Sequence, residues 1–526
     1  MTPLKQMLSL ALAIEGTFEN AGAQPAFVTE NGTLGWNEAG ERIRRLAGGL
    51  RELGMERNGR FAILSRNSFR YEELKWAGFW SGTVPVPLNW RCSVPELQYM
   101  LQDSAPTLVF VEGDFLEVME RPEFDAWRSR MVVIGDQGYR HSPGTEVLIE
   151  AARPQDPFVV DECADAILFY TGGTTGKGKA VRLSHRNVYI NALQVAAYLR
   201  PLRSDVFLHV APMFHTADLL ATCFVLRGAA NAYLPTAESL AVMTAIERSR
   251  ATATTLAPTM VIRLLNDPNF VNHDLSSLRC LLFGASAMTE EWIVRLARAL
   301  PDAALYHGYG LTETSPNISM LEPESIGGAL RAGTHGKILR SCGKPVLGAQ
   351  VRIVDDAGSA LPRGSAGEVI VRGPNLMSGY LNRPEDTAKA VRDGWLHTGD
   401  VGMLDDEGNL YILDRIKDMI VTGGENVYSA EVEQAISAHE GVLEAAVFGL
   451  PDDTFGERVA ACVVRNPEAD LTSEALIAHC RTRIAGYKVP RSIFFVSALP
   501  KTAVGKVDKR KLREAHEAHA FKGAGA

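Results

Sequence analysis

Residues 166–186 read AILFYTGGTTGKGKAVRLSHR and carry the most informative pattern in the sequence. Apolar residues 166–170 have the pattern of a strand and run directly into a stretch of glycine, threonine and lysine. Glycine allows positive φ and close approach of the backbone, so the N–H groups of such a stretch can converge on an anion. The hydroxyl groups and Lys179 add further donors and positive charge. The segment therefore predicts a phosphate-binding loop at the end of a strand.

A Walker A loop does not fit this segment. That motif needs G-x-x-x-x-G-K followed by Ser or Thr, whereas residue 178 is Gly and residue 171 is Thr. From this segment alone, a Gly/Thr hairpin without a ligand remains the alternative.

Outside this segment, short β-branched runs alternate with longer helical patterns. Residues 60–65 and 84–88 have the pattern of strands, and residues 71–82 between them have that of a helix. The same rhythm recurs at 107–113, 206–212 and 280–286, where each run ends in Gly, Pro or Ser. This alternation predicts βαβ units and a mostly parallel sheet. Loops at the ends of such strands are where open α/β sheets bind ligands.

The pattern changes twice towards the C-terminus. After Gly343, strands punctuated by glycine indicate an all-β segment, and from about Ile416 a compact α+β pattern follows. We therefore expect an α/β protein with a large N-terminal domain, residues 1–415, made of parallel βαβ sheets and a small β-barrel-like subdomain. A small, mobile α+β domain, residues 416–526, is expected to follow it.

Composition excludes several classes of protein. The 526 residues amount to about three domains at about 150 residues each. The formal charge of −8 argues against a nucleic-acid-binding protein, which should be basic. The seven cysteines show no C-x-x-C spacing, so we expect reduced thiols without disulfides or a zinc site.

No integral membrane segment is expected. The N-terminal apolar stretch is interrupted by Ser9 and ended by Glu15, which argues against a signal peptide. No window approaches the roughly 18 uninterrupted apolar residues of a membrane span. We expect a cytoplasmic protein, and a peripheral contact with a membrane remains open.

Residues 170–181, YTGGTTGKGKAV, resemble the signature loop of the adenylate-forming superfamily, which contains acyl-CoA synthetases, luciferases and nonribosomal adenylation domains. The family pattern Y-T-S-G-T-T-G-x-P-K-G has Ser, Pro and Gly where this chain has Gly172, Gly178 and Ala180. Further segments resemble the family's motifs in its order: APMFHT at 211–216, GASA at 284–287, YHGYGLTETSP at 306–316, GWLHTGD at 394–400 and LPKTAVGKV at 499–507.

The resemblance implies a site for ATP and AMP. Its expected residues are Thr171, Gly172, Gly173, Thr174, Thr175, Gly176, Lys179, Gly284, Ala285, Ser286, Tyr309, Gly310, Thr312, Asp400, Arg415 and Lys506. By resemblance, Tyr309 stacks on adenine, Thr312 touches the α-phosphate and Glu313 holds Mg²⁺. A lone carboxylate beside a triphosphate makes chemical sense when a hard cation bridges them.

The remaining roles also come from the resemblance. Asp400 would accept from the ribose hydroxyls, with Arg415 as a second ribose or phosphate contact. His215 would border the acyl and CoA tunnels, and Gly423 and Gly424 would line the pantetheine tunnel. Lys417 would be the hinge between the domains. The expected catalytic residues are Lys506, Glu313, Thr312 and His215.

The implied activity is that of an AMP-forming acyl-CoA synthetase, an acid–thiol ligase that uses ATP, Mg²⁺ and CoA. A carboxylate attacks the α-phosphate to give an acyl-adenylate and pyrophosphate, and the CoA thiol then displaces AMP. The expected partners are a small carboxylic acid, ATP and CoA, with no nucleic acid, and a homodimer remains open.

The acyl substrate is expected to be a hydrophobic monocarboxylic acid, because residues 211–224 and 283–311 are mostly apolar. Medium- or long-chain fatty acids come first, aromatic or alicyclic acids second and dicarboxylic acids last. Two alternatives stay open. One is an adenylating enzyme of the same fold with another acceptor, and the other is a catalytically silent nucleotide-binding protein.

Overall fold

The largest sheet of the structure has nine strands. The computed structural model describes residues 8–29, 32–136, 138–139, 143–171, 178–286, 288–333, 337–466, 469–501 and 507–517. The strands of this sheet, in spatial order, are β15 (Lys344–Pro345), β14 (Ser319–Leu321), β13 (Ala304–Tyr309), β12 (Cys280–Gly284), β11 (Ala253–Leu256), β9 (Val206–His209), β10 (Ala230–Tyr233), β1 (Pro25–Thr29) and β2 (Gly32–Gly35). The strands from β13 to β1 run parallel, and β14, β15 and β2 are antiparallel at the two edges.

Two smaller sheets complete the βαβ part of the chain. A four-stranded parallel sheet consists of β4 (Val84–Pro87), β3 (Arg60–Leu64), β5 (Leu108–Glu112) and β6 (Met131–Ile134). A three-stranded antiparallel sheet consists of β18 (Gly379–Tyr380), β8 (Lys179–Ser184) and β7 (Asp165–Thr171). The β7–β8 hairpin therefore flanks the glycine-rich segment, residues 172–177, which lies outside the described residues.

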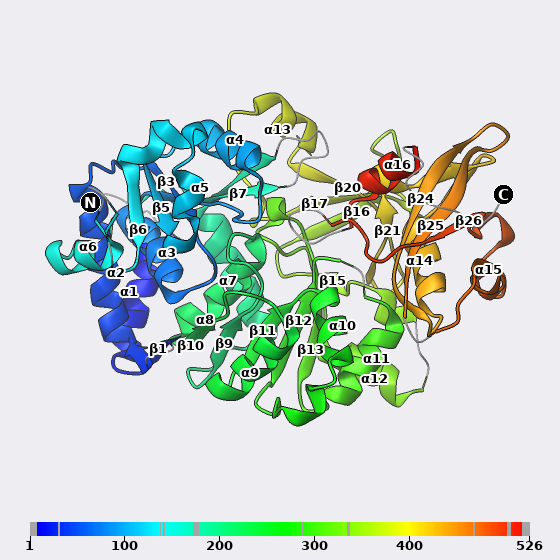
Figure 1. The fold of residues 1–526 in the computed structure, drawn as a ribbon, viewed down its shortest axis with the longest axis horizontal. Coiled ribbons are helices and arrows are strands. Elements are labelled where there is room, and N and C mark those ends of the chain that lie inside the picture. The colour runs from blue at the N-terminus through cyan, green and yellow to red at the C-terminus, as the bar shows by residue number, and fades with distance from the viewer. Residues whose placement is uncertain are drawn as a thin grey trace.

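Two five-stranded sheets follow towards the C-terminus. The first contains β16 (Gln350–Val354), β17 (Gly367–Arg372), β20 (Trp395–Leu404), β19 (Val391–Arg392) and β21 (Leu410–Arg415). The second contains β23 (Glu425–Val427), β22 (Ile420–Thr422), β25 (Gly456–Arg465), β24 (Val442–Asp452) and β26 (Ser492–Phe495). The second sheet and its helices form the C-terminal module at the right of Figure 1.

Helices cover these sheets and bury separate apolar cores. In the N-terminal part they are α1 (Leu10–Ala21), α2 (Trp36–Glu52), α3 (Phe69–Ser81), α4 (Val94–Ser104), α5 (Leu116–Met119), α6 (Thr145–Ala151), α7 (His185–Leu199), α8 (Thr222–Arg227), α9 (Ser239–Ser249), α10 (Pro258–Asn266), α11 (Glu290–Ala299), α12 (Pro323–Arg331) and α13 (Pro384–Ala390). In the C-terminal module they are α14 (Ser429–Ser437), α15 (Ser473–Arg481) and α16 (Lys509–Glu517).

Helix α3 is buried along nearly its whole length. The Ser68 hydroxyl caps its start by accepting from the Tyr71 N–H, and Gly82 ends it with φ +70°. Every residue from Tyr71 to Ser81 is buried, including three charged residues. A helix buried all round packs against several elements at once, and α3 contacts α1, α2, β1, β4 and β10.

The sequence predicted most of these elements correctly. The strands expected at 60–65, 84–88 and 280–286 are β3, β4 and β12, and the helix expected at 71–82 is α3. The α/β fold is confirmed. The all-β segment expected after Gly343 is wrong in one place, because α13 interrupts it. Pro at the first helical turn followed by two acidic residues, P-E-D, favours a helix start there.

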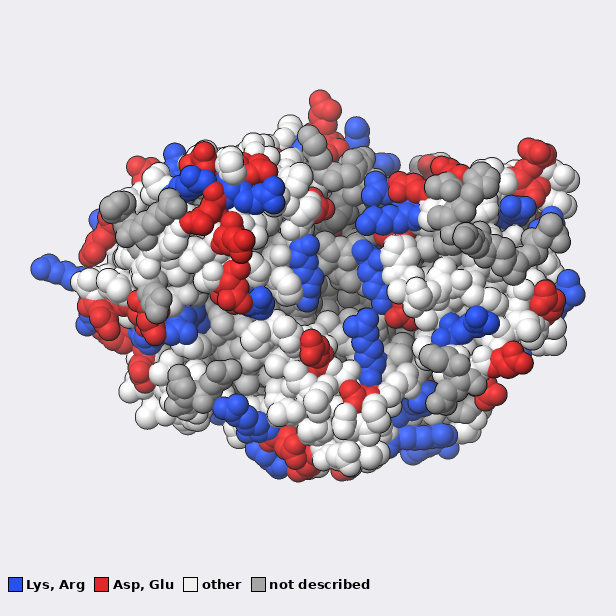
Figure 2. All heavy atoms as spheres, viewed as in Figure 1, with Lys and Arg blue, Asp and Glu red and all other residues white. Residues whose placement is uncertain are grey.

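One face of the molecule is hollowed near its centre, and Lys and Arg side chains gather along this hollow (Figure 2). The hollow lies between the βαβ part of the chain and the C-terminal module in this view. Among the described residues, we find no helix with the length and apolar character needed to cross a bilayer.

Two buried histidines, His185 and His307, should lower the stability of the folded state at acidic pH. Burial lowers the pKa of His185 and the pKa of His307 to about 4 each. In the part of the chain that the structure describes, neither ring nitrogen of His185 has a hydrogen-bond partner. Unfolding returns these pKa values to about 6.5. Stability is therefore full above about pH 6.5 and falls as the pH drops towards 4.

We expect the thermal unfolding midpoint to fall between pH 6.5 and 4, with each histidine worth up to roughly 3 kcal/mol. The variant His185→Leu should lose less of its midpoint over this range than the parent protein. Differential scanning fluorimetry at matched ionic strength measures both slopes. An unchanged slope in the variant would contradict a neutral, buried His185.

Candidate functional site

Three of the predicted site segments, two for the nucleotide and one bordering the acyl and CoA tunnels, follow neighbouring strands of the nine-stranded sheet. Residues 210–216 follow β9, residues 285–286 follow β12 and residues 310–314 follow β13. These strands are parallel and separated at most by β11, so their carboxyl ends reach the same edge. The structure thus places His215, Gly284 to Ser286, and Tyr309 to Thr312 along one edge, as an open α/β sheet requires for a ligand site.

Glycine is needed where the ends of β12 and β13 come together. A Cβ at Gly284 would collide with the carbonyl oxygen of Gly308 on the next strand. A Cβ at Gly310 would collide with the carbonyl oxygen of Pro316. The following residue, Ala285, has φ +70° and so turns the chain sharply after β12. These close approaches leave backbone rather than side chains along this edge, which suits a flat ring such as adenine.

Asp400 on β20 is a buried carboxylate with two close partners. The Tyr309 hydroxyl donates to Asp400 Oδ2 at 2.5 Å, and Arg415 Nε lies 2.5 Å from Asp400 Oδ1. Asp400 and Arg415 face each other directly in the β20–β21 pairing. Burial, and then the charge and hydrogen bond of Asp400, raise the pKa of Tyr309 well above its usual value. The Tyr309 hydroxyl therefore remains protonated and keeps donating to the carboxylate.

Glu313 lies in the short helix η5 (Thr312–Thr314) and has the surroundings of a cation ligand. The Tyr380 hydroxyl donates to Glu313 Oε1 at 2.8 Å, and the Met377 N–H holds its backbone carbonyl at 2.9 Å. Among the described residues, no Lys, Arg or His forms an ion pair with this half-buried carboxylate. A carboxylate without a counter-charge fits a hard cation such as Mg²⁺.

Lys179 is linked to Glu313 through Tyr380, whose ring faces the Lys179 ammonium and whose hydroxyl binds Glu313. It pairs with Thr171 across the β7–β8 hairpin, so both flank the glycine-rich loop. Its Nζ lies 3.2 Å from Asp386 Oδ2 and 5.0 Å from the centre of the Tyr380 ring. The loop residues expected to bind phosphate, Gly172 to Gly176, lie outside the described residues. Thr171 and Lys179 nevertheless fix where that loop begins and ends.

The segment after β9 meets the segment after β13. Thr216 Oγ1 lies 3.3 Å from Thr312 Oγ1, and the ring of His215 lies 4.6 Å from that of Phe214. His215 and Thr312, which are 97 positions apart in the sequence, are therefore brought to the same place.

The C-terminal candidates lie elsewhere. Lys417 is in the short helix η7 (Ile416–Asp418), directly after β21. Gly423 (φ +60°) and Gly424 (φ +84°) form the exposed turn between β22 and β23. The Gly423 N–H donates to the Phe455 carbonyl of the same module at 2.8 Å. Lys506 lies outside the described residues, so its role stays a prediction, as do those of Lys417 and both glycines.

Sequence reasoning missed Tyr380, Asp386 and Tyr99. Tyr380 binds Glu313, Asp386 binds Lys179, and the Tyr99 hydroxyl donates to the Gly178 carbonyl at 2.9 Å. None of them lies in a recognised motif, and no spacing rule links them to their partners. Only the P-E-D start of α13 could have signalled that Asp386 sits on a helix.

Comparison with known sequences decides the family. Residues 14–381 match the profile described as AMP-binding enzyme, and residues 431–506 match that of the AMP-binding enzyme C-terminal domain. The chain belongs to the AMP-binding enzyme family. The expected resemblance to adenylate-forming enzymes of the acyl-CoA synthetase branch is thereby confirmed.

Relatives match this AMP-binding enzyme along nearly its whole length. It is 36% identical to a feruloyl-CoA synthase of an Amycolatopsis species, over 92% of this chain and 95% of that protein. It is 33% identical to a long-chain-fatty-acid–CoA ligase of Yersinia pestis, over 94% of this chain and 93% of that protein. Among solved structures, the amide bond synthetase McbA from Marinactinospora thermotolerans gives a TM-score of 0.86 at 30% identity, over 96% of this chain and 99% of that one.

We expect Asp400→Asn to raise the KM for ATP roughly 10- to 100-fold, because a buried, charge-assisted acceptor is lost. The matched control is Asp405→Asn, a carboxylate that caps the turn of the same β-hairpin and accepts from the N–H of Asn409. Initial rates of pyrophosphate release at varied ATP measure both KM values. Equal KM values in the two variants would contradict a role for Asp400 in nucleotide binding.

Proposed function

We propose that this AMP-binding enzyme is an acyl-CoA ligase that acts on a hydrophobic monocarboxylic acid. In the first step, a carboxylate oxygen forms a bond to the α-phosphorus of ATP, and the bond from that phosphorus to pyrophosphate breaks. In the second, the CoA sulfur attacks the acyl carbon, AMP leaves and the thiol proton passes to solvent. The enzyme class and its use of ATP, Mg²⁺ and CoA agree with the family and with the named CoA ligases among its relatives.

The observation that carries this proposal is the Asp400 cluster beside Thr312 and Glu313. A buried carboxylate fixed by Tyr309 and Arg415 can accept from both hydroxyls of a ribose. Thr312 begins the helical turn that holds Glu313, so a ribose bound at Asp400 would bring its phosphates towards both. Mg²⁺ held by Glu313 would offset the charge of the phosphates.

The remaining residues would supply positioning and positive charge. Both steps need reacting groups brought together and charge neutralised, and neither needs a protein nucleophile. We assign Thr171, Lys179 and the intervening loop to the phosphates, with Gly284, Ala285, Ser286, Tyr309 and Gly310 along the adenine. Lys506 would stabilise the carboxylate and the α-phosphate in the first step.

The two steps would use two arrangements of one cleft. We propose that residues 1–415 form one domain and residues 416–526 another, which rotates about Lys417 between the steps. Separate family profiles on either side of this boundary support the division. Rotation would withdraw Lys506 and bring Gly423 and Gly424 to the pantetheine arm, where residues without side chains leave room for a thin chain. We further propose a cytoplasmic location and leave a homodimer as a prediction.

The substrate class follows from the apolar residues near the carboxyl ends of β9, β12 and β13. Medium- and long-chain fatty acids agree with the ligase of Yersinia pestis, and aromatic acids agree with the feruloyl-CoA synthase. We therefore propose a hydrophobic monocarboxylic acid, with medium- or long-chain fatty acids first, aromatic or alicyclic acids second and dicarboxylic acids last. A second acceptor class, an amine, is favoured by the similarity to an amide bond synthetase.

The direct test is release of AMP and pyrophosphate from MgATP across a panel of carboxylic acids, each with and without CoA. We expect CoA-dependent AMP release and a thioester with at least one fatty or aromatic acid, and none with succinate or malonate. Pyrophosphate release that CoA leaves unchanged, but that an added amine accelerates, would instead establish the amide-forming alternative. No release with any acid would contradict the proposal.

Lys506→Ala should slow adenylation by roughly 10²- to 10³-fold, as loss of one preorganised charge commonly does. Lys501→Ala is the matched control, because Lys501 lies in the same segment but pairs with Glu444 at 2.9 Å. ATP–pyrophosphate exchange measures adenylation in both variants. Exchange at the parental rate in Lys506→Ala would show that another group stabilises the α-phosphate.

A further inference from the structure

Helix α3 carries three buried charges, and its two charged faces have different neighbours. Glu73 and Arg70 are three positions apart and share one face, whereas Glu72 and Lys75 share another. The side chains of Glu72 and Glu73 are 1% exposed and that of Lys75 is 3% exposed. Burying three charges in one helix costs free energy unless each charge is paired. The partners of each face therefore show which segments of the chain α3 keeps in place.

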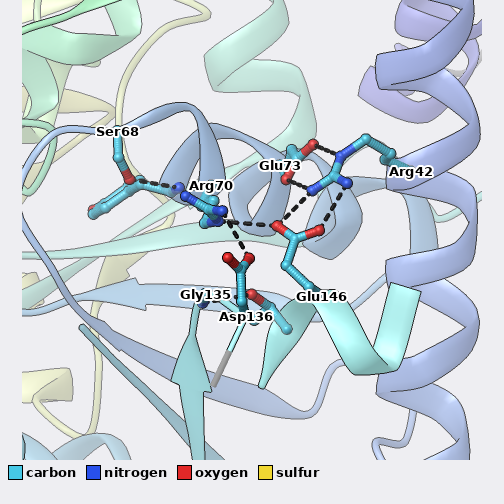
Figure 3. A network of polar contacts seen from close by, with 9 residues as sticks. Arg42, Ser68, Arg70, Glu73, Gly135, Asp136 and Glu146 are labelled. Atoms are coloured by element: carbon cyan, nitrogen blue, oxygen red, sulfur yellow. Dashed lines mark hydrogen bonds and ion pairs between the residues drawn. The ribbon is translucent and has the colours of Figure 1, made fainter. Parts of the chain in front are cut away.

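The first face fixes α3 to its surroundings (Figure 3). Arg42 on α2 binds Glu73 at 2.5 Å and Glu146 on α6 at 2.8 Å. Arg70 binds the same Glu146 at 2.9 Å and Asp136 at 3.1 Å. Two arginines and three carboxylates thus join α2, α3, α6 and the segment after β6. The helix is a rigid support for whatever its other face contacts.

The second face reaches the segment that carries His215. Lys75 Nζ lies 2.9 Å from Glu72 Oε2 and 2.5 Å from Asp218 Oδ2. Asp218 Oδ1 lies 2.7 Å from His209 Nδ1, and His209 Nε2 lies 3.2 Å from Asn231 Oδ1. Lys75 on α3 is therefore tied directly to Asp218, three residues beyond His215, and through it to the end of β9.

A metal site is the obvious alternative for this group. Ligand atoms of Glu72, His209 and Asp218 all lie within 4.8 Å of one another. The Lys75 ammonium, however, binds both carboxylates and supplies the positive charge that a metal would bring. Although burial raises it, the charge of Lys75 and the His209 ring lower the pKa of Asp218 to about 2. The group is therefore an ion-pair network in which Lys75 is the cation.

Asn67, which lies just before α3, and Tyr71 on α3 also bind residues 211–213, in the segment that carries His215. Asn67 Nδ2 donates to the Ala211 carbonyl at 3.0 Å, and the Met213 N–H donates to Asn67 Oδ1 at 2.8 Å. The Tyr71 hydroxyl donates to the Met213 carbonyl at 3.2 Å. Within the segment, the Asp218 N–H donates to the His215 carbonyl at 3.0 Å.

We propose that Lys75 is a positioning residue for residues 210–218 and, through Asp218, sets the place of His215. The inference rests on the proposed function, in which His215 borders the acyl and CoA tunnels. Loops without such ties open with little cost in free energy, and a misplaced group can slow a reaction by up to about 10²-fold. Because α3 is itself held in the core, its contacts with residues 210–218 restrict the motion of that loop.

The test compares Asp218, the acid that Lys75 of α3 binds, with Glu73, a buried acid on the other face of α3. Asp218→Asn keeps the shape of the side chain and removes the charge that Lys75 binds, and Tyr71→Phe removes a single hydroxyl from the same face. Glu73→Gln is the matched control, since Glu73 is equally buried but binds Arg42. The measurements are KM for ATP and for the best acid of the panel, the single-turnover rate of acyl transfer to CoA, and amide hydrogen exchange of residues 211–221.

For Asp218→Asn we expect roughly a tenfold rise in the KM for the acid or a similar fall in the transfer rate. Tyr71→Phe should shift the same quantity by a smaller factor, and the KM for ATP should stay within about twofold in both. Amide exchange of residues 211–221 should accelerate in both variants and remain parental in Glu73→Gln, even where that variant has a lower melting temperature.

Equal effects of Asp218→Asn and Glu73→Gln on all quantities would overturn the inference, because the network would then only stabilise the fold. Parental kinetics and exchange in Asp218→Asn would overturn it as well. The variant His215→Ala distinguishes failure of the positioning role of Lys75 from failure of the role that the proposed function gives to His215. If His215→Ala has the parental KM for the acid and the parental transfer rate, the assignment of His215 fails and the inference fails with it.

Discussion

The buried carboxylate of Asp400 joins the parts of the chain that have to act together. Tyr309 comes from the end of β13 in the nine-stranded sheet, Asp400 from β20 in the adjoining antiparallel sheet, and Arg415 from the end of β21. A buried carboxylate without partners is costly, so the three elements must keep their positions for Asp400 to keep its two partners. Arg415 is also the last residue of β21, directly before η7 and the C-terminal module. In the proposed function, this side chain would link nucleotide binding to the placement of that module.

The C-terminal module is fastened to the same region by polar contacts. The Ser429 N–H and hydroxyl at the start of α14 donate to Asp414, and Lys509 on α16 binds both Ser429 and Glu433. Arg513 lies 3.5 Å from Asp418, next to Lys417. Of these contacts, the hydrogen bonds between Ser429 and Asp414 join the two proposed domains, so a rotation about Lys417 has to break or replace them. The ion pairs of Lys509 and Arg513 lie within the C-terminal module.

The sequence predicted the parts of the site that local patterns control. Thr171 and Lys179 flank a strand-to-strand turn because the apolar runs on either side form β7 and β8. Gly284 is the last residue of β12 and Gly310 follows β13, where the run of apolar residues ends and close backbone contact excludes a side chain. The helix α3 follows from its serine cap, its length and its final glycine. These features depend on residues a few positions apart.

The contacts that orient the site could not be predicted in this way. Tyr380 and Glu313 are 67 positions apart, and Lys75 and Asp218 are 143 apart, so no periodicity relates them. Lys75 also violates the pattern of a buried helix, and only the carboxylates around it explain its burial. Helix α13 was missed because its P-E-D start lies within a run of short strands. Contacts between residues far apart in the sequence decide the cases of Tyr380 and Lys75, and the pattern of a single sequence does not record them.

In the proposed function, one edge of the nine-stranded sheet holds an acid and a nucleotide next to each other. The most direct measurement is calorimetric titration with a non-hydrolysable acyl-sulfamoyl adenosine, with AMP and the free acid titrated separately. The account predicts one site per chain and an affinity for the joined molecule at least about 10²-fold above that of either part, because the cost of association is met once. Binding of the joined molecule no tighter than that of AMP would contradict it, since the acid and the nucleotide would then occupy separate places.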